Sequence, residues 1–348
     1  MKEKGITYLF PAKIREILEK TGFNLEELYE IRLRVNAPMI VIYGGKEYFV
    51  AKDGRLTKKN VCMIEAEDLR ETMEYVSNYS MYAFEEEIRK GFITIQGGHR
   101  VGIAGKTVLD GDKIKSLKYI SYINLRLSHQ IKGCATPILP YIMKKNNVCH
   151  TLIISPPMCG KTTLLRDLIR QVSDGNRYLE GKTVGVVDER SEIAACYRGI
   201  PQNDMGIRTD VLDGCAKHMG MQMMLRSMTP EILAVDEIGS RTDKEAIDAV
   251  MNCGCCLLAT AHGASMEKMQ MRPALRQMAE EKIFERYVIL SRKNTVGKVE
   301  AILNADMDFL YQNHRGDLCH DRMRRSRTGY GRLLEEALCT AGTDAEVT

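Results

Sequence analysis

Residues 151–163 read Thr-Leu-Ile-Ile-Ser-Pro-Pro-Met-Cys-Gly-Lys-Thr-Thr, an apolar run followed by a loop of small residues that ends in Gly160, Lys161 and Thr162. This order is typical of a phosphate-binding loop, in which a buried strand leads through a tight turn into a helix. Backbone N–H groups and the helix N-terminus face the phosphates, the lysine contacts the β/γ oxygens, and the hydroxyl binds Mg²⁺. A helical pattern follows at residues 164–170, as the motif requires.

The loop departs from the usual G-x-x-x-x-G-K-[ST] pattern at two positions. Ser155 occupies the first glycine position, and the bulky Met158 lies inside the loop, where a positive φ would strain it. A chance Gly-Lys-Thr-Thr after an apolar strand is the alternative interpretation. We assign Thr162 to Mg²⁺ and the loop as a whole to the phosphates of ATP. The loop residues are Ser155, Pro156, Pro157, Met158, Cys159, Gly160, Lys161, Thr162 and Thr163.

Polar side chains follow three later apolar runs, each at the point where a strand is expected to end. Residues 230–239 place Asp236 and Glu237 after a buried run, where Asp236 is expected to hold Mg²⁺ through water and Glu237 to polarise an attacking water. Glu189 follows the run 184–187, and His262 follows the run 256–261. Because carboxyl ends of parallel strands meet at one edge of a sheet, we expect these residues to share one site with the loop.

Other interpretations remain open for several of these residues. Asp188, Glu189 and Arg190 fit either water-positioning groups and a magnesium second shell or a surface loop after a core strand. His262 fits either a sensor of the γ-phosphate or a satisfied structural histidine. Three arginines are candidates for contact with phosphate or with a neighbouring subunit, or are solvated. These are Arg226, Arg272 and Arg276.

Length and composition describe a water-soluble chain with two domains. The 348 residues are 44% hydrophobic and 28% charged, with a net charge of +4 that is too small to predict a nucleic-acid partner. No run reaches the length of a membrane span. Eleven irregularly placed cysteines and no apolar leader favour free thiols and a cytoplasmic location; Cys253, Cys255 and Cys256 lack a second pair that would predict zinc.

Strand and helix patterns alternate through the second half, which predicts a parallel sheet. We therefore expect an α/β protein, with a P-loop ATPase domain over residues 136–305 preceded by a smaller N-terminal α/β domain over residues 1–135. The N-terminal part shows short helices, a small antiparallel meander and a glycine-dense hairpin at 96–105. Residues 306–348 are expected to form a basic, flexible extension, either solvated or in contact with nucleic acid or anionic lipid.

Long stretches of the chain resemble the family of stage III sporulation protein AA, the sporulation ATPase of endospore-forming Firmicutes, itself similar to the traffic ATPases of type II and type IV secretion. The resemblance covers roughly residues 5–305. The family usually has Gly where Met158 stands, and it generally stops near residue 305. The matching stretches are 82–95, 97–105, 154–157, 159–167, 187–193, 201–204, 206–213 and 226–239.

This resemblance implies a RecA-like motor, a homo-oligomer expected to be hexameric, docked on the cytoplasmic, mother-cell side of a membrane channel complex. Its partners would be membrane proteins of that stage III complex, and it would touch the membrane only through them. Carried over by position, Asp236 and Glu237 form the Walker B pair, Glu189 belongs to the acidic box and His262 to the histidine box. Two alternatives stay open: a RecA-like nucleic-acid translocase, and a nucleotide-gated scaffold with little turnover.

Overall fold

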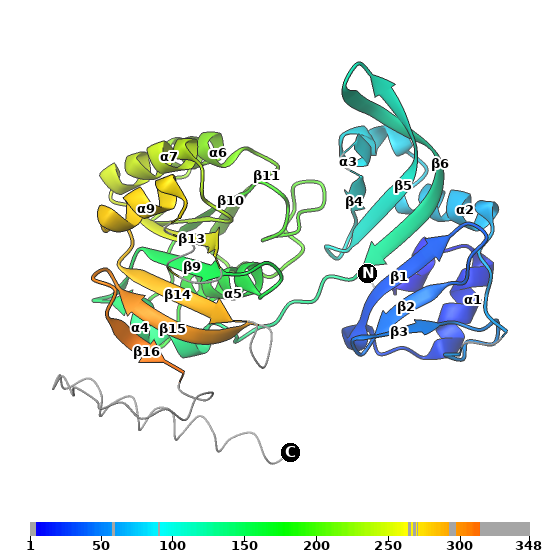
Figure 1. Cartoon of the computed structure of the whole chain (residues 1–348), viewed down its shortest axis with the longest axis horizontal. Helices are drawn as coiled ribbons and strands as arrows, with labels where there is room; N and C mark the ends of the chain where they lie inside the picture. Colours follow the sequence, from blue (N-terminus) through cyan, green and yellow to red (C-terminus); the bar gives the residue numbers. More distant parts are fainter. Residues whose placement is uncertain are drawn as a thin grey trace, which may run out of the picture. The chain divides into compact units, whose positions relative to one another are not determined.

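The computed structural model describes residues 5–57, 60–89, 91–263, 271–291 and 297–313, together with Met266 and Met269. Two large sheets organise these residues, one of six strands and one of eight (Figure 1). A small two-stranded hairpin joins β7 (Met143–Lys144) to β8 (Asn147–Val148). The described residues up to Gln312 belong to one compact unit, so the division into 1–135 and 136–305 stays a prediction.

The N-terminal sheet is antiparallel, with strand order β3-β2-β1-β6-β5-β4. Its apolar side chains alternate with polar ones and pack against α1 (Ala12–Thr21) and α2 (Ala66–Val76). Helix α1 ends at Gly22, whose φ of 63° supplies the left-handed C-cap. The strands are β1 (Leu28–Arg34), β2 (Ile40–Tyr43), β3 (Lys46–Phe49), β4 (Phe92–Thr94), β5 (Arg100–Asp110) and β6 (Lys113–Arg126), with α3 (Glu85–Arg89) before β4.

The glycine-dense stretch 96–105 serves two structural purposes. The turn between β4 and β5 contains Gly97 and Gly98, both with positive φ. Gly105 lies inside β5, where an added Cβ would stand 2.6 Å from the backbone oxygen of Tyr119. The strands therefore approach too closely there for any side chain, which accounts for glycine at that position.

The second sheet has the order β11-β10-β12-β13-β9-β14-β15-β16. The six strands from β11 to β14 run parallel, and β15 and β16 close one side in antiparallel fashion. The strands are β9 (Thr151–Ser155), β10 (Val184–Asp188), β11 (Thr209–Asp213), β12 (Ile232–Val235), β13 (Cys256–His262), β14 (Arg286–Ser291), β15 (Lys298–Asn304) and β16 (Phe309–Gln312).

Helices cover both faces of this sheet, which is why β9, β10 and β12 are buried along their whole length (Figure 1). Ile153 packs into the core that includes α5 (Lys161–Asp174), whereas Leu152 and Ile154 point into the opposite core. That second core holds α6 (Lys217–Ser227), α7 (Arg241–Asn252) and α9 (Pro273–Glu280). The loop after β9 and the loops after β10, β12 and β13 thus emerge at one edge, as expected for parallel strands.

The structure departs from the sequence patterns at three places. Helix α4 (Leu139–Ile142) is a single short turn that ends before the β7–β8 hairpin. Strand β11 has no counterpart among the apolar runs of the sequence. Strand β16 lies inside the range 306–348 that was expected to be flexible, because Phe309, Tyr311 and Gln312 pair with β15. The basic run at 321–327 lies outside the described residues.

The described cysteines are all free thiols, and no group of three or more His, Cys, Asp or Glu within the described ranges is arranged to hold a metal ion. Cys255 and Cys256 are buried while Cys253 is exposed, and burial raises the pKa of the Cys255 thiol to about 12. Among the helices that the structure describes, none has the length and apolar character needed to cross a membrane.

Candidate active site

The loop after β9 adopts the strand–turn–helix geometry that its sequence predicts. Gly160 has a φ of 83° and precedes α5, whose first residue is Lys161. Met158 has a φ of 58°, so the position does require the left-handed region that strains a bulky residue. Its side chain is 81% exposed and fills no space inside the loop. The Met158 side chain therefore fits the loop, and its energetic cost is confined to the strained backbone conformation.

Lys161 is buried at the base of the loop, with only 5% of its surface exposed. Its Nζ lies 3.2 Å from His262 Nδ1 and 3.9 Å from Glu237 Oε1. Since an ammonium group can only donate, Nδ1 accepts and the proton of His262 is on Nε2. That Nε2 lies 2.7 Å from Glu237 Oε1, so the imidazole joins the lysine to the carboxylate.

Thr162 and Asp236 are brought together at the carboxyl end of β12. The Thr162 hydroxyl donates to Asp236 Oδ2 at 2.8 Å, and the hydroxyl of the buried Thr260 donates to Oδ1. The same Thr260 hydroxyl accepts the backbone N–H of Glu237 at 2.9 Å. A hydroxyl and a carboxylate at one point are hard oxygen ligands of the kind that Mg²⁺ prefers.

Glu237 is held by side chains from the loop after β10 and from the end of β13. Its Oε2 accepts from Arg190 Nη1 at 3.1 Å, opposite the contact of Oε1 with His262. Its backbone has a φ of 54°, an uncommon conformation for a residue other than glycine. Strain of this kind persists where the surroundings impose it, and it is frequent at active sites.

Glu189 lies beside this group but points to a different partner. Its carboxylate pairs with Lys217 at the start of α6. Both side chains line a cleft of about 490 Å³ that also contains Glu237, His262 and Arg272. Of the three arginines considered from the sequence, Arg272 borders this cleft, and Arg276 pairs with Glu280 instead.

Asp188 organises the loop after β10. Its buried carboxylate accepts the backbone N–H groups of residues 192, 193 and 194 at 2.8–2.9 Å. Burial raises the pKa of this carboxyl to about 6, although the N–H donors act in the opposite direction. With its oxygens committed to the loop backbone, Asp188 supports the site rather than contacting a ligand.

Arg166 on α5 holds the same loop from its carbonyl side. Its guanidinium donates to the backbone oxygens of Ile193 at 2.5 Å and of Glu192 at 2.7 Å. Burial lowers the pKa of Arg166, with the charges of Asp188 and Asp236 opposing that change. The sequence showed Arg166 only as one residue of a helical pattern. The sequence signal for Arg166 was its position four residues after Thr162, which places it on the side of α5 that faces the neighbouring strand end.

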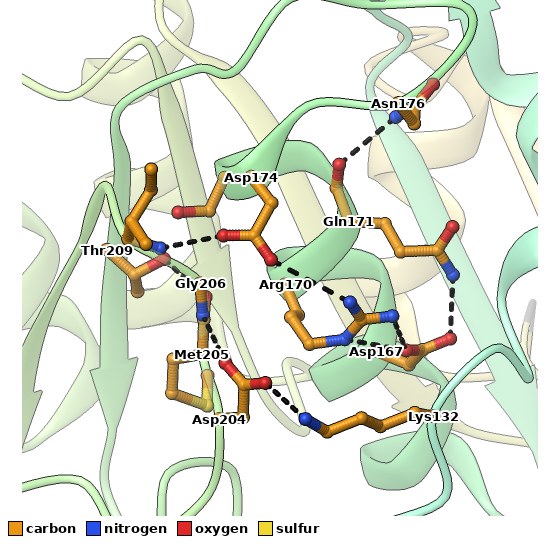
Figure 2. Close-up of polar contacts among 12 residues, drawn as sticks. Lys132, Asp167, Arg170, Gln171, Asp174, Asn176, Asp204, Met205, Gly206 and Thr209 are labelled. Atoms are coloured by element: carbon orange, nitrogen blue, oxygen red, sulfur yellow. Dashed lines mark hydrogen bonds and ion pairs between the residues drawn. The ribbon is translucent and has the colours of Figure 1, made fainter.

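A polar network at the far half of α5 was also missed (Figure 2). The buried Asp167 accepts from Ala135 N and Gln171 Nε2, both at 2.8 Å, and from Arg170. Asp174, the last residue of α5, accepts from Ile207 N at 2.9 Å. The helix that begins at the candidate phosphate site is thereby fixed to the segment before residue 136 and to the loop before β11.

The remaining loop residues are consistent with a tight turn. The Ser155 hydroxyl donates to Pro156 O at 2.8 Å, and the Cys159 thiol donates to Pro157 O at 3.5 Å. Thr163 lies in the first turn of α5, where its carbonyl accepts from the thiol of Cys134. Contacts of these residues with a nucleotide stay predictions.

Two solved structures share the fold. The pilus retraction motor PilT, determined with bound ADP, superposes with a TM-score of 0.56 at 14% identity, covering 98% of this chain and 88% of that one. The ATPase DotB of Legionella pneumophila superposes with a TM-score of 0.51 at 12% identity, covering 86% and 80%. The chain therefore has the RecA-like P-loop fold found in secretion and pilus ATPases.

Sequence comparison specifies the family within that fold. The family model described as "Sporulation stage III, protein AA" matches residues 1–309. Stage III sporulation protein AA of Bacillus subtilis (strain 168) is 43% identical over 284 residues, which are 82% of this chain and 89% of that protein. This chain belongs to the sporulation stage III protein AA family.

Proposed function

We propose that this protein is a Mg²⁺-dependent ATPase that acts as a motor during endospore formation. The observation that carries the proposal is the hydrogen bond between Thr162 and Asp236 beside Glu237, because it joins a phosphate-binding loop to a Walker B carboxylate. Membership of the sporulation family and the fold shared with secretion and pilus motors support the motor role.

The residues present fit ATP and Mg²⁺. Lys161 and the first N–H groups of α5 supply donors for phosphate oxygens, and Thr162 with Asp236 supplies oxygen ligands for the ion. Bound Mg²⁺ would neutralise charge on the phosphate oxygens. Glu237 would accept a proton from water at one of its carboxylate oxygens, and His262 would orient that carboxylate through Nε2. Glu189 would act from the cleft that it lines together with Glu237, where its carboxylate pairs with Lys217.

The assembly and location belong to the same proposal. We expect a homohexamer on the cytoplasmic, mother-cell face of a membrane channel complex, whose membrane proteins hold the motor in place and receive the work of hydrolysis. Sedimentation of the purified chain with and without a non-hydrolysable ATP analogue measures the oligomer. A monomer under both conditions would contradict the ring.

Phosphate release tests the activity. The wild-type chain is expected to release phosphate from ATP when Mg²⁺ is present and to stop when EDTA removes it. Glu237→Gln keeps the size of the side chain and removes its basicity, so the rate should fall by roughly 100-fold or more. Equal rates for the wild type and Glu237→Gln would show that the mechanism is wrong.

A further inference from the structure

The carboxylate of Glu237 is surrounded by three nitrogen groups. Arg190 Nη1 lies 3.1 Å from Oε2, His262 Nε2 lies 2.7 Å from Oε1, and Lys161 Nζ lies 3.9 Å from Oε1. These groups come from three separate elements, the loop after β10, the end of β13 and the start of α5. The arrangement is an anion site built from three directions, and in this structure a carboxylate of the protein occupies it.

The segment that carries Arg190 is held on both sides, while the arginine side chain is mostly exposed. Asp188 binds the backbone N–H groups on one side of the segment, and Arg166 binds its carbonyl groups on the other. Ser191 is further held by a 2.6 Å hydrogen bond to Asp213. The Arg190 side chain is 65% exposed, so its guanidinium can change partners without moving the loop.

We propose that Arg190 is a γ-phosphate contact supplied by the same chain, and that the γ-phosphate competes with the Glu237 carboxylate for its guanidinium. The inference rests on the proposed function. Lys161 is the phosphate-loop lysine, which reaches the β/γ oxygens, so a group that shares a carboxylate with Lys161 lies beside the γ position. Guanidinium binds phosphate oxygens as well as it binds carboxylates.

The exchange has a consequence for Glu237. Both of its oxygens are engaged in this structure, Oε1 by His262 and Oε2 by Arg190. A γ-phosphate that takes Arg190 leaves Oε2 able to accept a proton from water. ADP lacks that phosphate and leaves the Arg190–Glu237 pair intact. Arg190 therefore distinguishes ATP from ADP and couples this distinction to the release of Glu237.

Nucleotide affinity tests the assignment without measuring turnover. Calorimetric titration of the full chain with Mg²⁺ and either AMP-PNP or ADP is carried out on the wild type, Arg190→Ala and Arg190→Lys. Arg190→Ala should lose about tenfold in affinity for AMP-PNP, the size of one charge-assisted hydrogen bond, and stay within about twofold for ADP. The AMP-PNP affinity of Arg190→Lys should lie between the affinities of the wild type and Arg190→Ala.

Matched variants show whether a change in nucleotide affinity comes from this role of Arg190 or only from the loss of a positive charge. Arg198 is an exposed arginine on the same connection that lies over the Tyr197 ring, so Arg198→Ala should bind both nucleotides as the wild type does. Glu237→Gln removes the competing charge and should bind AMP-PNP more tightly, with a smaller change for ADP. If Arg190→Ala lowers the melting temperature, Arg190→Gln replaces it.

The outcomes distinguish a failure of the Arg190 assignment from a failure of the proposed ATPase function. A loss of affinity that is equal for AMP-PNP and ADP, or no loss for either, overturns the role of Arg190 and leaves the proposed ATPase standing. A wild-type chain that binds neither nucleotide overturns the proposed function, and the Arg190 assignment with it.

Discussion

Thr162 and Asp236 are 74 positions apart in the chain and are joined by a hydrogen bond of 2.8 Å. The second carboxylate oxygen of Asp236 accepts from the hydroxyl of Thr260, so both oxygens have a fixed direction. Two hydroxyl donors on one carboxylate place the first turn of α5 against the ends of β12 and β13. A hydroxyl and a carboxylate oxygen therefore lie side by side, as the proposed Mg²⁺ site requires.

Thr162→Val should remove most of the dependence of nucleotide affinity on Mg²⁺. The substitution keeps the shape of the side chain but deletes one proposed ligand of Mg²⁺, and we expect a loss of about tenfold or more in nucleotide affinity in the presence of Mg²⁺. Titrations with AMP-PNP in Mg²⁺ and in EDTA measure it. Thr209→Val is the control, because the Thr209 hydroxyl bonds Met205 O instead. An unchanged Mg²⁺ effect in Thr162→Val would rule out the site.

Met158→Gly should be more stable than Met158→Ala by about 1 kcal/mol. Both variants delete an exposed side chain, but alanine keeps the strain of a φ near 58° and glycine does not. Urea denaturation of both variants measures the difference. Because Met158 already adopts the loop conformation, phosphate release should change by less than about twofold. A large gain in rate for Met158→Gly would show that this residue limits turnover.

Asp188 should make the protein less stable as the pH rises from 4 to 7. Burial raises the pKa of this carboxyl from 3.8 to about 6, so between those values the folded state binds more protons than the unfolded state. The free energy of unfolding then falls with rising pH, by up to about 3 kcal/mol. Asp188→Asn should lack this decline, whereas Asp210→Asn, at an exposed position on β11, should keep it. The measurement is urea denaturation at intervals of pH. Parallel curves for the wild type and Asp188→Asn would contradict it.

Asp167→Ala should destabilise the protein by about 3 kcal/mol. The change removes the shared acceptor of the Gln171 amide and the Arg170 guanidinium (Figure 2). It also leaves the buried Ala135 N–H without its acceptor. Asp174→Ala on the same helix loses a half-exposed acceptor and should cost about 1 kcal/mol. Thermal and urea unfolding compare the two variants. Equal losses of stability in the two variants would mean that the burial of Asp167 does not strengthen the contribution of its hydrogen bonds.

The sequence predicts that the candidate site residues lie close together because parallel strands restrict where their ends lie. The structure brings Lys161, Glu237 and His262 into contact with one another. It also joins Thr162 to Asp236, and the Thr260 hydroxyl links Asp236 to the backbone of Glu237. Their roles toward a nucleotide stay predictions. The parallel-sheet prediction needs only the alternation of strand and helix patterns, and those patterns are strong when strands are buried on both faces.

What the sequence did not predict depends on tertiary contacts. Strand β11 has half-exposed and polar residues because it lies at the sheet edge, so its sequence looks like a loop. The same is true of β16, the other edge strand. The pairing of Glu189 with Lys217 and the loop-binding role of Asp188 involve backbone groups and directions that no residue pattern specifies.

At position 237 the left-handed backbone favours glycine or asparagine for folding, whereas the proposed chemistry requires glutamate. In a library that samples all residues at 237, selection for folded protein should enrich glycine and asparagine, which tolerate a φ of 54° at low cost. Selection for sporulation should instead retain glutamate. A site where the two selections disagree marks a residue that evolution has kept for chemistry at the expense of stability.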